Sequence, residues 1–242
     1  MNDTLRRALA DARLGETDVS TALSVDPKTV QRWVAGRIPQ RRHRWGLADL
    51  VGQREFELWP DLAHGGAPSQ CPEIRASYPH RSAVPREAWH RLFADAEREI
   101  GVLVYSGLFL AEDVEALRIL TERARAGVRV RVLLGDPDSA AVAGRGVEEG
   151  IAEAMPAKVR NALVHYRPLL RIDGAEIRLH ATVLYNSLYR ADDDVLVNTH
   201  VHGIPASHAP VLHLHTNEES DLVATYLDSF ERVWASATPP SR

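Results

Sequence analysis

Six of the eleven histidines of this chain lie between residues 180 and 215, and imidazole side chains can hold metals or phosphate. On a β-strand, residues i and i+2 point to the same face, so we expect His200 to project with His202, and His213 with His215. We predict a polar ligand pocket, with no resident metal or cofactor, built from His180, Thr182, Asn198, His200, His202 and His213. A metal-responsive site made of the two histidine pairs is the alternative.

Two further features that could bind metal have structural explanations. Asp192, Asp193 and Asp194 are consecutive, which is typical of a hairpin turn rather than of a carboxylate metal site. Cys71 is the only cysteine, which excludes an internal disulfide and a zinc site built on cysteine pairs. Nothing near Cys71 in the sequence would activate its thiol, so we read it as an ordinary residue of a linker.

A second set of polar side chains lies in the stretch TDVSTALSVDPKTVQRWVAGR, residues 17–37. The stretch predicts two short helices joined by a tight turn. Asp26 suits an N-cap, Pro27 the first helical position and Gly36 a C-cap. Apolar residues give each helix an inward face and fill the turn between them: Val19, Ala22 and Leu23, then Val25, then Val30, Trp33 and Val34.

The outward residues of the second helix are of the types that reach base edges and phosphates in a major groove. Six basic residues and no acidic one lie between Asp26 and Asp49, so the net charge of −4 hides a local basic stripe. We predict DNA contacts from Thr17, Lys28, Thr29, Gln31, Arg32, Arg37, Arg41 and Arg42. The alternative is a small helical bundle with a solvated basic face.

This region resembles the lambda-repressor-like (Xre-type) helix-turn-helix family over about residues 3–62. The matching stretch runs from Thr17 to Pro39 and includes the sequence VQRWVAGRIP. The resemblance implies a first helix at 3–14, with Leu5, Ala8, Leu9 and Ala12 inward, and closing helices within 45–62. It also implies binding of operator DNA in the major groove, usually as a dimer on a palindromic site.

The remainder of the chain has the pattern of an α/β domain. A strand at 100–106, a helix at 112–126 and a strand at 128–134 predict a parallel βαβ unit. A long helical stretch from 138 to 166 follows, which we expect to break at Pro156. We predict further strands at 169–172, 176–180, 182–189, 195–201 and 211–215, a helix at 88–99 and a closing helix at 221–236.

The domain order follows from composition. Residues 1–62 form the predicted all-α domain, the Gly- and Pro-containing segment 63–74 forms a linker, and residues 75–242 form the α/β domain, with a mixed sheet flanked by helices. No apolar run reaches the roughly 18 residues that a membrane span needs, and the first residues lack the apolar core of a signal peptide. We therefore expect a cytoplasmic protein.

The sequences GVRVRVLLGDP and IRLHATVLYNSLYRADDDVLVNTH, with the order of elements around them, resemble one repeat of the phospholipase D superfamily over about residues 75–236. That resemblance implies the signature H-x-K-x4-D followed by G-S-x-N. In the family, the histidine attacks phosphorus, the lysine neutralises the phosphate oxygens, and two motifs meet at one site, often across a dimer.

This chain matches the signature only in part. His180 stands at the histidine position, Thr182 replaces the lysine and Ser187 replaces the aspartate. Asn198 stands near the later asparagine, without the glycine and serine before it. Lys158 is the only lysine of the domain, and without a lysine in the motif the site loses the electrostatic stabilisation on which phosphoryl transfer depends. We predict that the fold is retained and the catalysis lost.

These expectations combine into a DNA-binding transcription regulator. Its second domain would sense a small-molecule ligand and form a homodimer, and it would set the spacing of two recognition helices on double-stranded DNA. Three alternatives stay open: a phosphodiesterase or nuclease that uses His180 in a dimer, a metal-responsive regulator, and an adaptor that recruits another protein.

Overall fold

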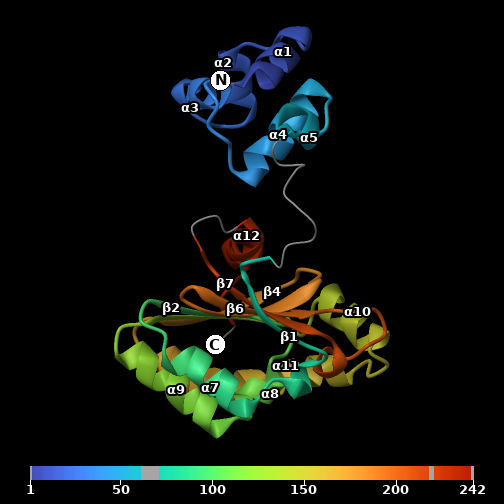
Figure 1. The fold of residues 1–242 in the computed structure, drawn as a ribbon. Coiled ribbons are helices and arrows are strands. Elements are labelled where there is room, and N and C mark those ends of the chain that lie inside the picture. Colours follow the sequence, from blue (N-terminus) through green and yellow to red (C-terminus); the bar gives the residue numbers. More distant parts are fainter. Residues whose placement is uncertain (1, 61–70, 218–220, 241–242) are drawn as a thin grey trace. The chain divides into compact units, whose positions relative to one another are not determined.

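The computed structural model describes residues 2–60, 71–217 and 221–240 of the chain. It divides into two compact units, residues 1–70 and 71–242 (Figure 1). The described part of the first unit contains only helices: α1 (Asp3–Asp11), α2 (Glu16–Ala22), α3 (Pro27–Val34), α4 (Arg41–Val51) and α5 (Glu55–Leu58).

The start of α3 is as predicted from the sequence. Asp26 adopts an extended conformation, and its carboxylate accepts a hydrogen bond of 2.8 Å from the backbone N–H of Lys28. Pro27 occupies the first helical position, where its missing N–H has no helical partner to lose. The helix ends at Ala35, and Gly36 then takes a φ of 115°, a region that favours glycine.

One side chain from each helix fills the centre of the first unit. Leu5, Val19, Val30, Leu47 and Leu58 are all fully buried, and Trp33 and Trp59 pack around them. Two expectations were wrong in detail. The first helix stops at Asp11 instead of residue 14, because Arg13 takes a positive φ of 55°. Ala22, expected inward, is exposed.

The second unit is a mixed α/β fold, as expected. Its seven-stranded sheet has the order β1-β7-β6-β5-β2-β3-β4. Strands β2, β3 and β4 run parallel to one another, and the other neighbours are antiparallel. The strands are β1 (Ile74–Tyr78), β2 (Glu99–Leu103), β3 (Arg129–Gly135), β4 (Ala175–His180), β5 (Asn186–Ala191), β6 (Asp194–Thr199) and β7 (Val211–His215).

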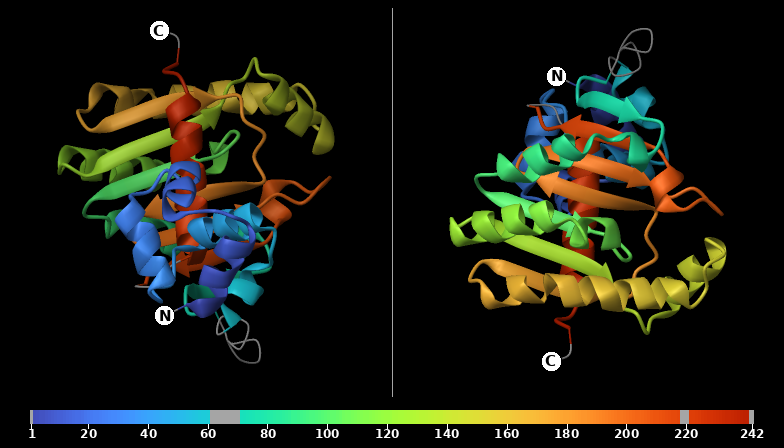
Figure 2. Two further views of the ribbon diagram at one scale, coloured as in Figure 1. Left: turned by 90° about the horizontal axis from the view of Figure 1, so that it is seen from above. Right: turned by 90° about the horizontal axis from the view of Figure 1, so that it is seen from below.

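Helices cover both faces of this sheet (Figures 1 and 2). On one face lie α7 (Arg86–Ala94), α8 (Leu108–Ala111), α9 (Val114–Arg125) and α11 (Ala154–Tyr166). On the other face, α12 (Asp221–Ser236) crosses the strands. The helix α10 (Ala140–Glu148) lies beside α11, and η1 (Arg81–Ala83), η2 (Arg167–Arg171) and η3 (Ala206–His208) are short 3-10 helices.

Burial on both faces explains the sequence of the central strands. Ile100–Leu103 in β2 and Val130–Leu134 in β3 are buried throughout, apolar apart from Gly101 and Arg131, and these two strands form the parallel pair of the predicted βαβ unit. Arg131 is 5 % exposed. Its guanidinium donates to Glu99 and Glu231 and lies 4.8 Å from the ring centre of Phe230. These contacts attach α12 to the sheet.

The predicted elements between residues 138 and 201 needed correction. The long helical stretch breaks at 149–153, where Gly150 and Ala152 have positive φ. It does not break at Pro156, which lies in the first turn of α11, where a backbone N–H has no helical partner. Residues 169–172 belong largely to the 3-10 helix η2 and do not form a strand.

The ends of the sheet differ from expectation as well. Strand β1 was missed, β5 begins at Asn186 instead of 182, and β6 ends at Thr199 instead of 201. Asp192, with a φ of 51°, turns the chain between β5 and β6, as expected for a hairpin. Among the described residues, no helix is both long and apolar enough to cross a bilayer.

The N-cap of α3 gives a stability prediction. Asp26→Ala removes the acceptor for Lys28 N–H and should cost about 1 kcal/mol of local stability. Asp26→Asn keeps an oxygen acceptor and should cost a few tenths of that. Hydrogen exchange measured by mass spectrometry on peptides from α3 checks the difference, and equal protection in the two variants would contradict the assigned cap.

Candidate functional site

Helix α3 has a polar and a buried side. Lys28, Gln31 and Arg32 are exposed, whereas Val30 and Trp33 are buried in the core of the first unit. Thr29 is half-buried and Thr17, at the start of α2, is exposed. The two helices pack against each other, so the polar side chains of α3 and the first turn of α2 belong to one surface.

The chain that follows α3 extends the positive charge. Arg37, Arg41 and Arg42 are exposed. Helix α4 begins with arginines and has no acidic residue in its first turn, and no side chain caps its N-terminus. Positive side chains oppose the helix dipole at this end, so the start of α4 is electrostatically suited to an anion.

Arg44 has a different role from its basic neighbours. Its Nε donates to Glu55 over 2.5 Å and its Nη1 donates to the carbonyl of Pro39 over 2.9 Å, and both charged side chains are largely buried. This ion pair joins α4 to α5. The eight residues expected to contact DNA therefore all belong to one helical unit, and the buried Arg44 is outside that set.

One acidic side chain lies against the polar side of α3. The amide of Gln31 donates to Glu16 over 2.8 Å. This contact directs the Gln31 side chain toward the start of α2. It also identifies which end of the amide is the nitrogen and which is the oxygen. Gln31 keeps a second N–H and its amide oxygen for a partner, so a partner can bind while the contact with Glu16 persists.

In the second unit, His180 is buried and fully hydrogen-bonded. Its Nε2 donates to the carbonyl of Val104 over 3.1 Å, and its Nδ1 accepts from the N–H of Thr182 over 3.3 Å. Because a carbonyl only accepts, these contacts define a neutral ring with its proton on Nε2. Burial lowers the pKa of His180 from its ordinary value, which keeps the ring neutral.

A small cavity of about 100 Å³ lies beyond the carboxyl end of β2. We call it the His200 pocket; the polar side chains that line it are those of Arg81, Tyr105, Ser106, Glu149, Lys158, Ser187, Tyr189, His200 and Ser207. The carboxylate of Glu149 is paired with Arg145 over 2.7 Å. Ligands of sheets with parallel strands commonly bind outside the carboxyl ends of those strands. Arg81 and Lys158 make no ion pair with any residue that the structure describes.

His200 is held as a neutral ring in this pocket. Its Nδ1 donates to the carbonyl of Leu184 over 3.1 Å, which leaves Nε2 to accept a hydrogen bond of 3.0 Å from the Ser187 hydroxyl. Burial lowers the pKa of His200 to about 4, and the nearby Arg145 acts in the same direction. The ring of Tyr105 stacks on it at 5.6 Å.

Tyr189 carries a buried hydroxyl without a hydrogen bond of good geometry among the described residues. Its side chain is fully buried and lines the His200 pocket. Burial raises the pKa of Tyr189, and Arg81 and Ser187 are near enough to oppose that rise. A buried polar group without a partner costs about 1–3 kcal/mol, so this hydroxyl is suited to meet a bound ligand.

The six residues expected to share one ligand pocket do not come together. Of the six, His200 alone lines the His200 pocket. Strand β6 ends at Thr199, so His202 does not share a strand face with His200. His202 is exposed and pairs with Glu148, and Thr182 is half-buried beside His180. Asn198 is buried, donates to the carbonyls of Ala209 and Pro210, and lines none of the described pockets.

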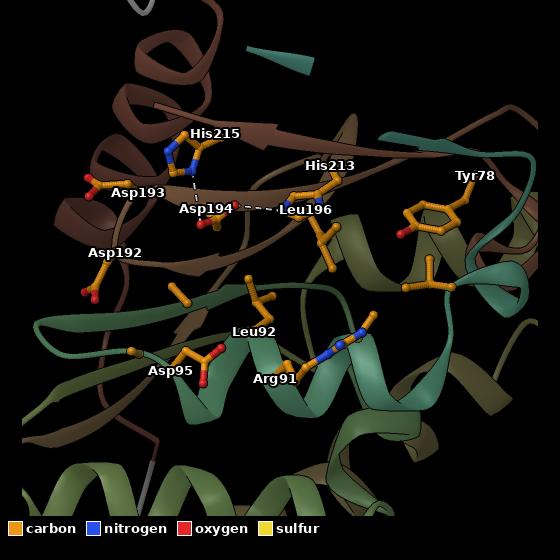
Figure 3. Close-up of a pocket in the computed structure, with 14 residues that line it drawn as sticks. Tyr78, Arg91, Leu92, Asp95, Asp192, Asp193, Asp194, Leu196, His213 and His215 are labelled. Atoms are coloured by element: carbon orange, nitrogen blue, oxygen red, sulfur yellow. Dashed lines mark hydrogen bonds and ion pairs between the residues drawn. The ribbon is translucent and has the colours of Figure 1, made fainter. Parts of the chain in front are cut away.

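His213 and His215 do share a face of β7, as expected, but they line a different cavity. Both rings contact Asp194 (Figure 3). In the described part of the chain, no group of three or more His, Cys, Asp or Glu side chains is placed to hold a metal ion. The two histidine pairs therefore do not converge on a metal site there.

The sequence analysis missed three residues of the His200 pocket. Arg81 lies in the 3-10 helix η1 and Lys158 in α11, so the fold brings them to His200 from distant parts of the chain. Lys158 carried a signal as the one lysine of the domain. Tyr189 lies two residues after Ser187 on the same face of β5, which the strand period alone could have indicated.

No protein-family model matches the sequence, and no curated protein sequence matches it. Solved structures with partial similarity include TrmBL2, an archaeal chromatin protein with a novel mode of DNA binding, with 15 % identity, a TM-score of 0.43 and coverage of 89 % of this chain and 72 % of the other.

Two further solved structures show partial similarity to this chain. Nuc from Salmonella typhimurium, a phospholipase D family member, shares 14 % identity with a TM-score of 0.41 over 69 % of this chain and 96 % of Nuc. Phosphatidylserine synthase from Haemophilus influenzae shares 13 % identity with a TM-score of 0.46 over 96 % of this chain and 54 % of the synthase. At TM-scores below 0.5, function must be judged from this chain's own residues.

The neutral state of His200 gives a pH prediction. Below about pH 6.5 the unfolded chain protonates this histidine, whereas the folded chain keeps it neutral down to a pKa of about 4, so acidification through this window destabilises the fold. At pH 5 the loss should be about 2 kcal/mol. His200→Gln should lose correspondingly less stability than the wild type between pH 7 and pH 5 in urea unfolding followed by fluorescence.

The matched control is His202→Gln, which changes an exposed histidine two residues after His200. It should retain the wild-type loss of stability on acidification. Equal pH dependence in the wild type and His200→Gln would show that His200 is not held neutral by the fold.

Proposed function

We propose that this protein binds double-stranded DNA with α3 as the recognition helix of a helix-turn-helix domain, and that its second unit is a non-catalytic, phospholipase D-like domain that binds a ligand. The observation that carries the proposal is the division of α3 into two sides. Val30 and Trp33 fix the helix in its domain, and Lys28, Gln31 and Arg32 are left outward. The protein would then act as a transcription regulator.

The size of α3 supports this assignment. A helix with its side chains is about 10–12 Å across, which fits the major groove of about 12 Å, and the eight residues of α3 extend about 12 Å along their own axis. Arg32 has the donor geometry to bind guanine O6 and N7, and Gln31 has both the donor and the acceptor that adenine requires. Glu16, which now accepts from Gln31, would repel phosphate and so favours entry of α3 in a single orientation.

The residues around α3 are suited to phosphate. Arg37, Arg41 and Arg42 are exposed, and the start of α4 presents free backbone N–H groups beside two of them. Phosphate contacts of this kind orient a protein on the duplex without reading its sequence. In the proposed complex, Thr17 at the start of α2 and the start of α4 contact the backbone on the two sides of the groove.

A single helix reads only a few base pairs, so we propose that the chain acts as a homodimer on two half-sites. Recognition helices of such dimers lie about 34 Å apart, one turn of the duplex. A ligand of the second unit that favours one dimer geometry would change this spacing, and with it the affinity for DNA.

The ligand that fits the His200 pocket best is a small oxyanion. Arg81 and Lys158 supply positive charge, and the buried hydroxyl of Tyr189 lies beside them and can donate to a ligand. The one carboxylate of the lining, Glu149, is already paired with Arg145. His200 contributes no charge because its pKa is about 4. The volume of about 100 Å³ has room for a phosphate-sized group.

The phosphodiesterase alternative requires His180 to attack phosphorus, and its environment opposes that role. Both ring nitrogens of His180 are hydrogen-bonded to the backbone, and His180 does not line the His200 pocket. Hydrolysis of bis(4-nitrophenyl) phosphate that is abolished by His180→Ala would favour the enzyme instead. The metal-responsive alternative would be favoured by stoichiometric zinc or nickel in elemental analysis of the purified chain.

Contacts to base edges and contacts to phosphates predict different effects of mutation on DNA binding. On a selected binding site, Arg32→Ala should weaken binding by roughly 1–3 kcal/mol if it reads a guanine. Arg41→Ala and Arg42→Ala should weaken binding to all duplexes alike, and each should lower the slope of log K against log salt by about 1. Fluorescence anisotropy with labelled duplexes at several salt concentrations measures both effects.

Arg7→Ala is the matched control, since it removes the same charge from the exposed side of α1. It should leave the salt slope within error of the wild type. The groove assignment fails if Arg32→Ala and Arg42→Ala behave no differently from Arg7→Ala on every duplex.

The anion pocket predicts binding of inorganic phosphate. Lys158→Met keeps most of the side-chain volume and removes the charge, and it should weaken phosphate binding about tenfold or more, as should Tyr189→Phe. Arg160→Met is the control, because Arg160 lies in the same helix as Lys158, α11, but forms an exposed ion pair with Asp138. This variant should bind phosphate as the wild type does. Isothermal titration calorimetry measures these affinities, and equal binding by all four proteins would contradict the pocket.

A further inference from the structure

A second, larger cavity lies at the opposite end of β5 and β6 from the His200 pocket. Its volume is about 500 Å³, within the range of about 300–1,000 Å³ that small-molecule sites occupy. It is bounded by α7 on one side and by β1, β6, β7 and the turn between β5 and β6 on the other (Figure 3). We call it the Asp194 cavity.

The floor of the Asp194 cavity is apolar. Aliphatic side chains from α7 and from the sheet form it: Val84, Ala88, Leu92, Ala96, Ala191 and Leu196. Such a floor favours the hydrocarbon part of a ligand, at about 25 cal/mol per Å² removed from water. A bare inorganic ion would gain nothing from it.

The carboxylate of Asp194 lies between two histidines in the polar part of the lining. The carboxylate of Asp194 accepts from His213 Nε2 over 2.8 Å and from His215 Nδ1 over 3.1 Å. A carboxylate cannot donate, so each neutral ring must place its proton on the nitrogen that faces Asp194. The second nitrogens, His213 Nδ1 and His215 Nε2, are then acceptors, and both rings are about one-third exposed.

The charged groups of the cavity are unevenly distributed. Four carboxylates line it against one arginine, Arg91. In Figure 3, Asp95 and Asp192–Asp194 lie at one end, while Arg91 extends toward Tyr78 at the other. Arg91 does not reach the acidic end, where Arg98, from outside the lining, compensates part of the negative charge by pairing with Asp192 and Asp193.

The carboxylates at the acidic end differ in how well they are satisfied. Asp192 accepts from the backbone N–H groups of residues 97–99, and Asp193 pairs with the guanidinium of Arg98. The carboxylate of Asp95, by contrast, forms no hydrogen bond or ion pair with any residue in the described ranges. Asp95 is thus the carboxylate without a partner on the side of α7. Asp194, on the side of the sheet, keeps acceptor lone pairs beyond those that its two histidines use, so it can also meet a ligand.

We propose that the Asp194 cavity binds a small organic cation, an amine or guanidinium compound with an apolar body. The cationic head would donate hydrogen bonds to Asp95, Asp194 and the free nitrogen of His215, and the body would lie on the floor near Leu92 and Leu196. An anion is repelled from this end, and a neutral ligand leaves the carboxylates without a counter-charge. This site is independent of DNA binding and of the His200 pocket.

The experiment compares three probes of one shape on the full-length protein: phenethylamine, 2-phenylethanol and phenylacetate. Calorimetry should detect saturable binding of one phenethylamine per chain, binding of the alcohol weakened about tenfold or more, and no binding of the carboxylate. Equal affinity for the amine and the alcohol, or no binding of the amine at millimolar concentration, would overturn the proposal.

Variants locate the bound amine. Asp95→Asn, on an exposed side chain, should weaken phenethylamine binding about tenfold, and Asp194→Asn should do the same. Ala88→Phe fills the floor without changing charge and should abolish binding. Asp138→Asn, an exposed carboxylate outside the cavity, should have no effect. Unchanged affinity in both Asp95→Asn and Ala88→Phe would show that the amine binds elsewhere.

Discussion

The buried side of α3 is the constraint on which the proposed DNA-binding surface depends. A helix of eight residues is too short to be stable alone in water, where about 12–15 residues are needed. Val30 and Trp33 supply the missing stability by packing into the core, and Asp26 closes the first turn. Their positions leave Lys28, Gln31 and Arg32 no direction but outward, so the polar side is fixed before any partner arrives.

The second unit uses burial differently, since burial there suppresses the positive charge of two histidines. Burial lowers the pKa of both His180 and His200 and keeps the rings neutral, although their hydrogen bonds to backbone carbonyls act in the opposite direction. The positive charge of the His200 pocket comes instead from Arg81 and Lys158. At the other end of β5 and β6 the lining is acidic, so one sheet carries two cavities of opposite charge.

Residue types with strong backbone preferences and apolar periodicity predicted several helices and strands correctly. Asp26 and Pro27 start α3 as expected, the βαβ unit of β2, α9 and β3 is parallel, and α12 has the predicted bounds. Pro156 misled because a proline breaks a helix only beyond its first turn. The run at 169–172 is apolar enough for a strand, but most of it belongs to the 3-10 helix η2, which begins at Arg167 and has Pro168 in its first turn.

The pockets could not be predicted from the chain alone, because their walls come from residues far apart in sequence. Arg81, Lys158 and His200 meet only after the sheet and α11 have packed. The pairing of His213 with His215 followed from the strand period, but their partner Asp194 depends on the register of β6 and β7. Sequence indicated which side chains share a strand face, and the fold decided which cavity each one lines.

Methylation interference tests the central claim most directly, because it asks whether α3 enters the major groove. Duplexes bound by the protein are methylated at guanine N7, which lies in the major groove, or at adenine N3, which lies in the minor groove. The account predicts that guanine N7 methylation within the bound site abolishes binding and that Arg32→Ala removes this sensitivity at one position. Binding that is indifferent to guanine N7 and blocked by adenine N3 methylation would contradict it.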